Sequence, residues 1–336
     1  MQDGKRSMQR ISAYAGNRKD YVQGGGGNTS VKLDDSLMAI KASGYTLQEV
    51  TVEKGFVTVD YQKIRQYYNT VDAAEDRDFE KESLSVNLGS VVLLEGMENR
   101  RPSVEVGFHS FLKKNVIHTH SVYANILCCS AEGRAAAASI LQSEKYVFIP
   151  YIDPGFRLTL AIKQAIDEYI IMHGVQPQVI LMENHGIVVH SDDDDETMVL
   201  HERVNDKIRA YFKLPEFPVP VIRKTDSGYA SDTGYLKRFL DENRADEAYF
   251  GALTLYPDQL VYIGGKLGDT VRIQGGEVLY TASRKEAEAI EETLVGVVYV
   301  INEIRRAGLT LREMGQEGAA FINNWESEKY RSKLIK

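Results

Sequence analysis

The chain has 336 residues, of which 43% are hydrophobic and 26% are charged, and its formal net charge is −8. This composition is typical of a globular protein with a substantial core and excludes an extended disordered chain. The negative balance makes nucleic acids and anionic membranes poor partners, so an anionic ligand would need a local cluster of donors.

The cysteine content and the lack of long apolar runs indicate the compartment. Cys128 and Cys129 are the two cysteines and are adjacent, which excludes a framework of structural disulfides and favours a reducing environment. No apolar run reaches membrane-spanning length, and the N-terminal MQDGKRSMQR lacks the apolar segment of a secretory signal. We therefore expect a cytoplasmic protein with no nucleic-acid or membrane partner.

Strand-like and helix-like segments alternate along residues 1–214, which favours an α/β or α+β class. One helix has Pro154 near its start and Gly174 as its C-cap, and another has Ser103 near its N-cap. The predicted elements are a strand in 36–44, a helix in 102–114, a strand followed by a helix in 115–133, a helix in 154–174, two strands in 175–191 and a helix in 196–214.

A proline-rich segment marks the predicted boundary between two regions. LPEFPVPVIRK, residues 214–224, contains three of the eight prolines. We predict a first domain over residues 1–214 and a smaller α+β region over 225–336, whose role the sequence does not reveal. Within the second region the pattern predicts a helix over 233–245, a hairpin over 249–265 and mostly helix from about Ser283.

Two histidines stand two residues apart in HTH, at the end of an apolar strand. Because strand side chains alternate, His118 and His120 point the same way and can face one metal ion. Neutral imidazole is a common ligand for zinc and its neighbours. Alone, the pair also fits polar residues at a strand end.

The segment ENHG supplies a third histidine, and PSVEVGFH supplies a carboxylate. His185 lies at a break between two strand-like runs, where Gly186 permits close approach, although NHG also fits an ordinary turn. Glu105 falls in the first turn of the predicted helix, where the helix dipole favours its charge, so it could be a metal ligand, a general base or a plain helix-terminal acid. His109, four residues later, is a rival ligand or a packing residue. Together, three histidines and a glutamate match a catalytic zinc site with an exchangeable position.

The glycine run GGGGNTSVK, residues 24–32, precedes three small polar residues. Bare backbone amides beside Asn28, Thr29 and Ser30 are typical of an anion cradle, whereas a flexible linker is the simpler alternative. The spacing differs from GxGxxG, and no acidic ribose partner is evident, which disfavours a nucleotide-dependent oxidoreductase.

In this order, GGGGNTSVK, KASG (41–44), PSVE, HTH and ENHG resemble the class II aldolase/adducin family over about residues 10–214. PYxxPGF (150–156) and LYPDQLV (255–261) are similar to the aldolase-like part of long rhamnulose-phosphate aldolase/dehydrogenase fusions in that family. The resemblance implies a three-layer α/β/α domain around a largely antiparallel sheet, followed here by the smaller α+β region. It also implies a homotetramer with zinc near the subunit interface.

The resemblance also implies roles for individual residues. The zinc ligands would be His118, His120 and His185, and Glu105 would be the acid/base carboxylate. The groups that bind the substrate phosphate would be Asn28, Thr29, Ser30, Ser43, Gly44 and Ser103.

The expected activity is that of a metal-dependent lyase, which acts on a phosphorylated or anionic sugar through a zinc-stabilised enediolate. A decarboxylase, an epimerase, a dehydratase and a non-catalytic adducin-like binding module remain the alternatives. Manganese, cobalt or iron could replace zinc on such ligands.

Two features depart from the sugar-phosphate aldolases of this family. Those enzymes have a second serine where this chain has Val104, so one phosphate donor is lost. They also use a tyrosine as proton donor, which should fall in residues 130–145, and that stretch contains none. Tyr146 and Tyr151 follow but do not match cleanly, so the sequence supports a lyase more strongly than aldol cleavage in particular.

Overall fold

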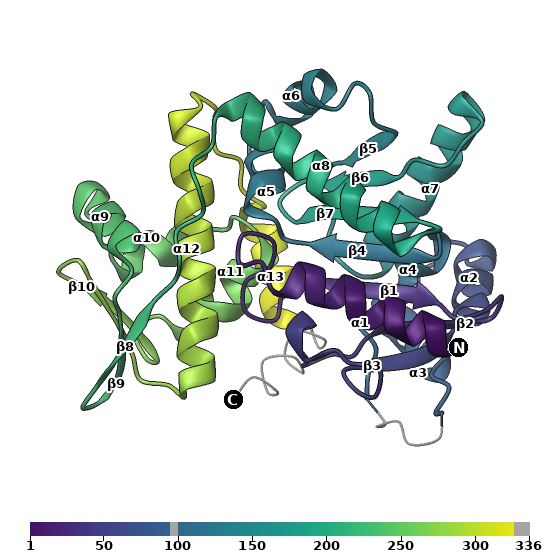
Figure 1. The fold of residues 1–336 in the computed structure, drawn as a ribbon, viewed down its shortest axis with the longest axis horizontal. Coiled ribbons are helices and arrows are strands. Elements are labelled where there is room, and N and C mark those ends of the chain that lie inside the picture. Colours follow the sequence, from purple (N-terminus) through teal and green to yellow (C-terminus); the bar gives the residue numbers. More distant parts are fainter. Residues whose placement is uncertain (95–99, 326–336) are drawn as a thin grey trace.

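The computed structural model describes residues 1–94 and 100–325. The first part of the chain is built on a seven-stranded sheet with the order β3-β2-β1-β4-β7-β6-β5 (Figure 1). Neighbouring strands are antiparallel except β5 and β6, which are parallel. The strands are β1 (Asn28–Lys32), β2 (Leu37–Lys41), β3 (Phe56–Asp60), β4 (Asn115–Thr119), β5 (Tyr146–Ile149), β6 (Val179–Met182) and β7 (Gly186–Ser191).

Helices cover both faces of this sheet, so the predicted three-layer α/β/α arrangement is confirmed (Figure 1). Strand alternation divides the core: Ile117 clusters with Met8 of the first helix, whereas Val116 clusters with Phe108 on the opposite face. On the first face lie α1 (Gln2–Gly16), α5 (Val122–Cys128), α6 (Gly133–Ile140) and α8 (Asp194–Phe212). On the second lie α2 (Tyr61–Thr70), α3 (Phe79–Gly89), α4 (Val106–Phe111) and α7 (Phe156–His173).

The helix predicted over 102–114 is shorter than expected. It runs only from Val106 to Phe111, with Glu105 as its N-cap rather than in its first turn. The preceding backbone pairs with the sheet instead, because the amide of Ser103 donates to the carbonyl of Lys41 at 3.0 Å. At the other end, the Lys32 ammonium donates to the carbonyl of Leu112, which satisfies a backbone acceptor at the helix terminus.

The second region contains a four-stranded antiparallel sheet and one long helix. The sheet has the order β10-β11-β9-β8, and α12 lies between it and the first region (Figure 1). Its elements are β8 (Ile222–Thr225), β9 (Gly228–Ser231), α9 (Gly234–Asn243), α10 (Glu247–Ala252), α11 (Pro257–Tyr262), β10 (Val271–Gln274), β11 (Glu277–Tyr280), α12 (Arg284–Arg306) and α13 (Gly315–Asn324). Short 3₁₀ turns cover Leu47–Glu49 and Gly264–Lys266.

The hairpin predicted over 249–265 is wrong, since this segment forms α10 and α11. Pro257 begins α11 at a position where its missing N–H costs nothing. The buried side chain of Gln259 accepts from the amide of Leu255 at 2.9 Å and donates to the carbonyl of Leu253 at 2.9 Å. These side-chain bonds replace the ladder bonds that a hairpin would have made.

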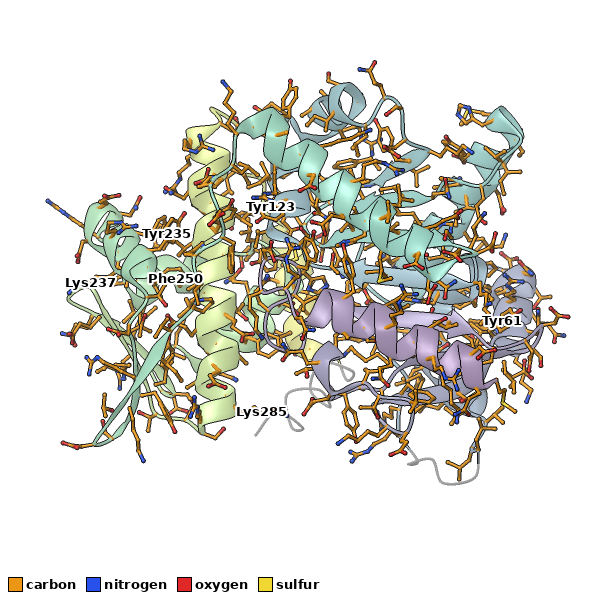
Figure 2. All side chains as sticks on the ribbon, in the orientation of Figure 1. Tyr61, Tyr123, Tyr235, Lys237, Phe250 and Lys285 are labelled. Atoms are coloured by element: carbon orange, nitrogen blue, oxygen red, sulfur yellow. The ribbon has the colours of Figure 1, made fainter. Side chains whose placement is uncertain are left out.

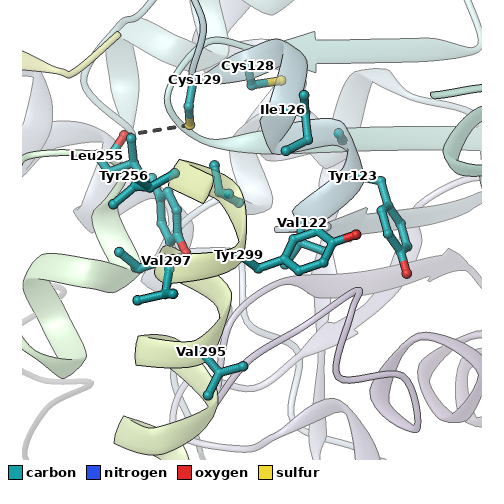
Figure 3. Packing of buried hydrophobic residues seen from close by; sticks show 14 of the residues in the cluster. Val122, Tyr123, Ile126, Cys128, Cys129, Leu255, Tyr256, Val295, Val297 and Tyr299 are labelled. Carbon is teal, nitrogen blue, oxygen red and sulfur yellow. Dashed lines mark hydrogen bonds between the residues drawn. The ribbon is translucent and has the colours of Figure 1, made fainter. Parts of the chain in front are cut away.

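One apolar core runs through both regions. Figure 3 shows Tyr123 and Cys129 of the first region close to Tyr299 of α12 and Leu255 of the segment before α11, all within one buried cluster. On the far side of α12, Tyr235 of α9 packs on the same cluster and Phe250 of α10 belongs to it (Figure 2). Cys128 and Cys129 are both buried and free, as expected for packing residues.

Among the described residues, no helix has both the length and the apolar character needed to cross a bilayer.

Candidate metal centre

Strand pairing decides which residues of the glycine-run motif face the histidines. β1 pairs with β4 so that Asn28 lies opposite His118 and Thr29 lies opposite Ile117. Asn28 therefore shares the face of His118, and Thr29 points to the other face. There the Thr29 hydroxyl lies 2.6 Å from that of Ser12 in α1.

His118, His120 and His185 converge, and all three are buried. Their ligand nitrogens lie within 4.8 Å of one another, and their ring centroids are 4.9 to 5.2 Å apart. His185 reaches the other two because the β6–β7 turn packs on the end of β4. Asn184 takes a left-handed conformation in that turn (φ 52°), and Gly186 leaves no room for a side chain beside the carbonyl of Thr119.

The hydrogen bonds of the outer ring nitrogens fix the tautomers. His118 Nδ1 lies 3.0 Å from the carbonyl oxygen of Ile187, and His120 Nδ1 lies 2.5 Å from a carboxylate oxygen of Asp258. Because carbonyl and carboxylate oxygens accept, each Nδ1 carries a hydrogen, and in the neutral form that a metal ligand requires each Nε2 keeps its lone pair.

Those two lone pairs face each other, since the two Nε2 atoms are 3.1 Å apart. Two lone pairs at this distance repel, and a cation between them removes the repulsion. Two Zn–N bonds of ~2.0–2.1 Å at a tetrahedral angle would place the nitrogens about 3.3 Å apart. Burial also lowers the pKa of His118 to about 3, so this ring stays neutral at physiological pH, as a metal ligand must. The donor set therefore fits a divalent cation.

Glu105 stands beside the histidine cluster. Its carboxylate oxygens lie 3.0 Å from Nε2 of His185 and 3.3 Å from Nε2 of His118. The side-chain amide nitrogen of Asn28 donates to the same carboxylate at 2.5 Å. Burial opposes the charge, but the contacts of the carboxylate with the His118 and His185 rings, including a hydrogen bond from His185, outweigh it and hold the pKa of Glu105 well below its usual value. A charged carboxylate is thus fixed next to the candidate metal position.

A cavity opens from Glu105, His120 and His185 toward the predicted anion cradle. Asn28, Ser43, Gly44 and Ser103, four of the groups predicted to bind the substrate phosphate, line it. The two loops that carry Ser43 and Ser103 are paired through their backbones, since the amide of Ser43 donates to the carbonyl of Arg101 at 2.9 Å. Asn28 also donates to the hydroxyl of Ser103 at 3.0 Å, which joins the cradle to the carboxylate site.

The remaining predicted residues lie outside the cavity lining. The Ser30 hydroxyl lies 2.7 Å from Nδ1 of His109, and both side chains are fully buried behind the site. His109 is therefore a packing residue and not a fourth histidine of the cluster. Asp193, Asp194 and Asp195 form a separate acidic group, in which Asp193 caps α8 by accepting from the amide of Glu196 at 3.0 Å.

Sequence reasoning missed several residues that line the cavity. Lys41, the first residue of KASG, is buried there, and its ammonium donates to the carbonyl of Tyr45 at 2.7 Å. Pro257, Asp258 and Trp325 enter from the second region. In the sequence, Asp258 stands out only as part of LYPDQLV, a segment that carries the family resemblance. No local pattern links Asp258 to a histidine 138 residues away.

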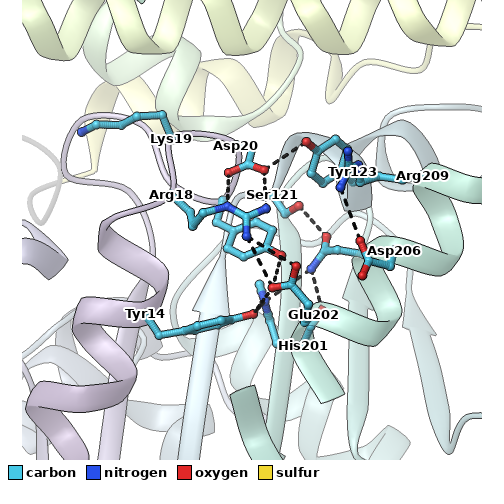
Figure 4. A network of polar contacts seen from close by, with 12 residues as sticks. Tyr14, Arg18, Lys19, Asp20, Ser121, Tyr123, His201, Glu202, Asp206 and Arg209 are labelled. Carbon is cyan, nitrogen blue, oxygen red and sulfur yellow. Dashed lines mark hydrogen bonds and ion pairs between the residues drawn. The ribbon is translucent and has the colours of Figure 1, made fainter. Parts of the chain in front are cut away.

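A polar network on the opposite face of β4 fixes the backbone that carries the site. Figure 4 shows Arg18, Asp20, Ser121, His201 and Glu202 in this network. Nε2 of His201 lies 2.8 Å from the hydroxyl of Thr119, the residue between the two histidines of HTH. The carbonyl of Asp20 accepts from the amide of Val122 at 2.9 Å. The chain just before the glycine run is thereby tied to the chain just after HTH.

The family model for the Class II Aldolase and Adducin N-terminal domain matches residues 7–212. A Bacillus subtilis protein described as an uncharacterized oxidoreductase, YuxG, is 28% identical over 186 residues, which are 53% of this chain and 25% of that protein. The chain thus matches only a quarter of the length of the Bacillus relative.

A second relative is 3-oxo-tetronate 4-phosphate decarboxylase of Haemophilus influenzae, at 24% identity over 211 residues, 58% of this chain and 81% of the decarboxylase. Among solved structures, the N-terminal class II aldolase domain of a conserved protein from Thermoplasma acidophilum has 23% identity and a TM-score of 0.51. That similarity covers 61% of this chain and 92% of the domain.

The family match spans more than half of the chain, so the chain belongs to the class II aldolase and adducin family. Members of this family are generally enzymes, and its class II aldolases typically depend on a divalent metal. The histidine cluster is a group of side chains that could hold such a metal.

Proposed function

We propose that the chain is a divalent-metal-dependent lyase that acts on a phosphorylated or otherwise anionic sugar. The observation that carries the proposal is the convergence of His118, His120 and His185 beside the charged carboxylate of Glu105, at one end of a cavity with polar walls. Zinc is the metal that three imidazoles and a carboxylate suit best, and other divalent transition metals are alternatives.

A bound divalent cation would supply the positive charge that stabilises an enediolate or a related oxyanion. Glu105 would take the proton from the substrate, since its carboxylate is charged and is held by the side-chain amide of Asn28. Asn28 fixes the direction of that carboxylate, so the base need not reorganise when the substrate arrives.

The anionic end of the substrate would bind against the polar groups that line the same cavity. Ser43 and Ser103 offer hydroxyls there, Gly44 offers close backbone approach at φ 89°, and Lys41 adds a buried positive charge. We leave Thr29 and Ser30 out of this proposed set because their hydroxyls lie beside Ser12 and His109 instead.

Decarboxylation of a phosphorylated 3-oxo acid is the second candidate. The likeness to the Haemophilus influenzae decarboxylase, which covers 81% of that protein, favours it. The absence of a tyrosine in residues 130–145 also weakens aldol cleavage. Both reactions need a stabilised oxyanion, so the same metal and cradle would serve either one. A non-catalytic binding module is disfavoured because the ligand set is complete.

The test begins with the metal content of the purified full-length chain. The metal-loaded protein is then incubated with dihydroxyacetone phosphate and a panel of aldehydes in one arm, and with phosphorylated 3-oxo acids in the other. Condensation supports an aldolase and release of carbon dioxide supports a decarboxylase, and His185→Ala should abolish either. A protein that takes up no Zn²⁺, Mn²⁺, Co²⁺ or Fe²⁺ refutes the proposal.

The homotetramer and the cytoplasmic location remain predictions. Light scattering of the purified chain tests the first, and fluorescence of a tagged chain in cells tests the second.

A further inference from the structure

We infer that Asp258, from the second region of the same chain, is a positioning residue of the metal centre. Its carboxylate holds the Nδ1–H of His120 and thereby turns Nε2 of that ring toward the cation. This inference rests on the metal site of the proposed function and goes beyond it, because it gives residues 225–336 a part in that site.

The contact is short and shielded from water. Oδ2 of Asp258 lies 2.5 Å from Nδ1 of His120, and the two side chains are 1% and 5% exposed. The glycine run makes room for the carboxylate: a Cβ at Gly26 would lie 2.3 Å from Oδ2 of Asp258 and 3.1 Å from Nδ1 of His120. Gly26 is therefore needed for this approach.

α11 is fixed to the two segments that carry the site, so Asp258 is held in place. The hydroxyl of Tyr262, at the end of α11, accepts from the amide of Gly25 at 2.7 Å. At the other end, the side chain of Asn184, in the His185 turn, donates to the carbonyl of Leu255 at 2.8 Å. The carboxylate thus lies on a short helix whose position is set by the glycine run and by ENHG.

A carboxylate on the outer nitrogen of a ligand histidine fixes the tautomer and raises the basicity of the inner nitrogen. His118 has only the carbonyl of Ile187 at that position, so His120 is the histidine with the stronger partner. Loss of such a partner typically weakens metal binding by about 10–100-fold. We therefore expect the second region to contribute to metal affinity through this residue.

The experiment measures Zn²⁺ affinity by competition with a chromogenic chelator, on the full-length chain and without substrate. Asp258→Asn should weaken binding by about 10–100-fold, and Asp258→Glu should recover part of the loss. Asp246→Asn is the matched control, because Asp246 lies in the same region, caps α10 through the amide of Tyr249 and is exposed. This control should bind zinc like the unmodified chain.

A second readout separates positioning from a purely structural role. Long-range ¹H–¹⁵N spectra of the zinc-loaded chain should show His120 protonated at Nδ1, and Asp258→Asn should shift that Nδ1 signal. If Asp258→Asn does not fold, Gly26→Ala displaces the carboxylate without removing its charge and should weaken zinc binding as well.

The outcomes distinguish the two proposals. If the unmodified chain binds no zinc or other divalent metal, the proposed function fails. If it binds zinc and Asp258→Asn binds it equally well, or if the His120 signal is unchanged, the inference about Asp258 is overturned while the proposed function stands.

Discussion

The turn that brings His185 to the other histidines has no space for a side chain at Gly186, and we predict that Gly186→Ala disrupts the metal centre. A Cβ there would lie 2.3 Å from the carbonyl oxygen of Thr119 and 3.2 Å from Cα of His120, whereas ordinary contact begins at 3.4 Å. β7 and the end of β4 must therefore separate by roughly 1 Å, the difference between the first and last of these distances.

The substitution should change both the free energy of folding and the affinity for zinc. Overpacking of this kind costs typically ~1–3 kcal/mol of folding free energy. Functional side chains must be held within ~0.5 Å of their productive positions, so the shift should also weaken zinc binding by at least about tenfold. Both effects have the same cause, and each can be measured on its own.

Thermal unfolding of the metal-free protein and chelator competition for Zn²⁺ are the two assays. Gly89→Ala is the control, because Gly89 ends α3 and a Cβ there would have no heavy atom within 4 Å. That variant should keep its zinc affinity and unfold at the same temperature or slightly higher. If Gly186→Ala matches the unmodified chain in both assays, the close approach of the turn to HTH is wrong.

Three further predictions concern catalysis, substrate binding and pH. Glu105→Gln should lower turnover by about 10²–10⁴-fold while the imidazoles still bind metal, and metal analysis beside steady-state kinetics checks this. An equal loss of metal and activity would make Glu105 chiefly a ligand. Lys41→Gln should raise KM for a phosphorylated substrate by about tenfold or more, since a charge-assisted hydrogen bond is worth ~1.5–3 kcal/mol. KM for an uncharged analogue should not change, and a rise for both would refute an anion-binding role. Burial lowers the pKa of His201 to about 3, so between that pH and the ordinary pKa near 6.5 only the unfolded chain binds the proton. Stability should therefore fall as the pH drops through this window, by ~1.4 kcal/mol per pH unit for this residue, and urea unfolding of His201→Gln should show a slope smaller by that amount. An unchanged slope would mean that His201 is already protonated in the folded protein.

Local patterns predicted much of the arrangement of the histidine cluster. The two-residue spacing of HTH was sufficient to place His118 and His120 on one side of a strand, because alternation is a property of any extended backbone. The position of His185 followed from a turn between two apolar runs. The same alternation also places Asn28 and Thr29 on opposite faces of the sheet. The motif alone does not show which of the two faces the histidines, and only the pairing of β1 with β4 does.

The sequence could not predict contacts between residues that lie far apart along the chain. Asp258 carries no local signal, since its partner is a histidine 138 residues earlier and the pattern around α11 predicts a hairpin instead of a helix. The apolar alternation of residues 249–265 is the pattern of a strand, and it was overridden by Pro257 and by the side-chain bonds of Gln259. Lys41 was quoted within a motif, yet its burial in the cavity depends on loops that meet only in the folded chain.

The cluster that joins Tyr123 of α5 to Tyr299 of α12 has a consequence for how the molecule can be divided. A fragment ending in the proline-rich segment would lose α12, and the apolar flank of α5 would then face solvent. Such a fragment should self-associate, and calorimetry of the intact chain should record a single endotherm instead of two.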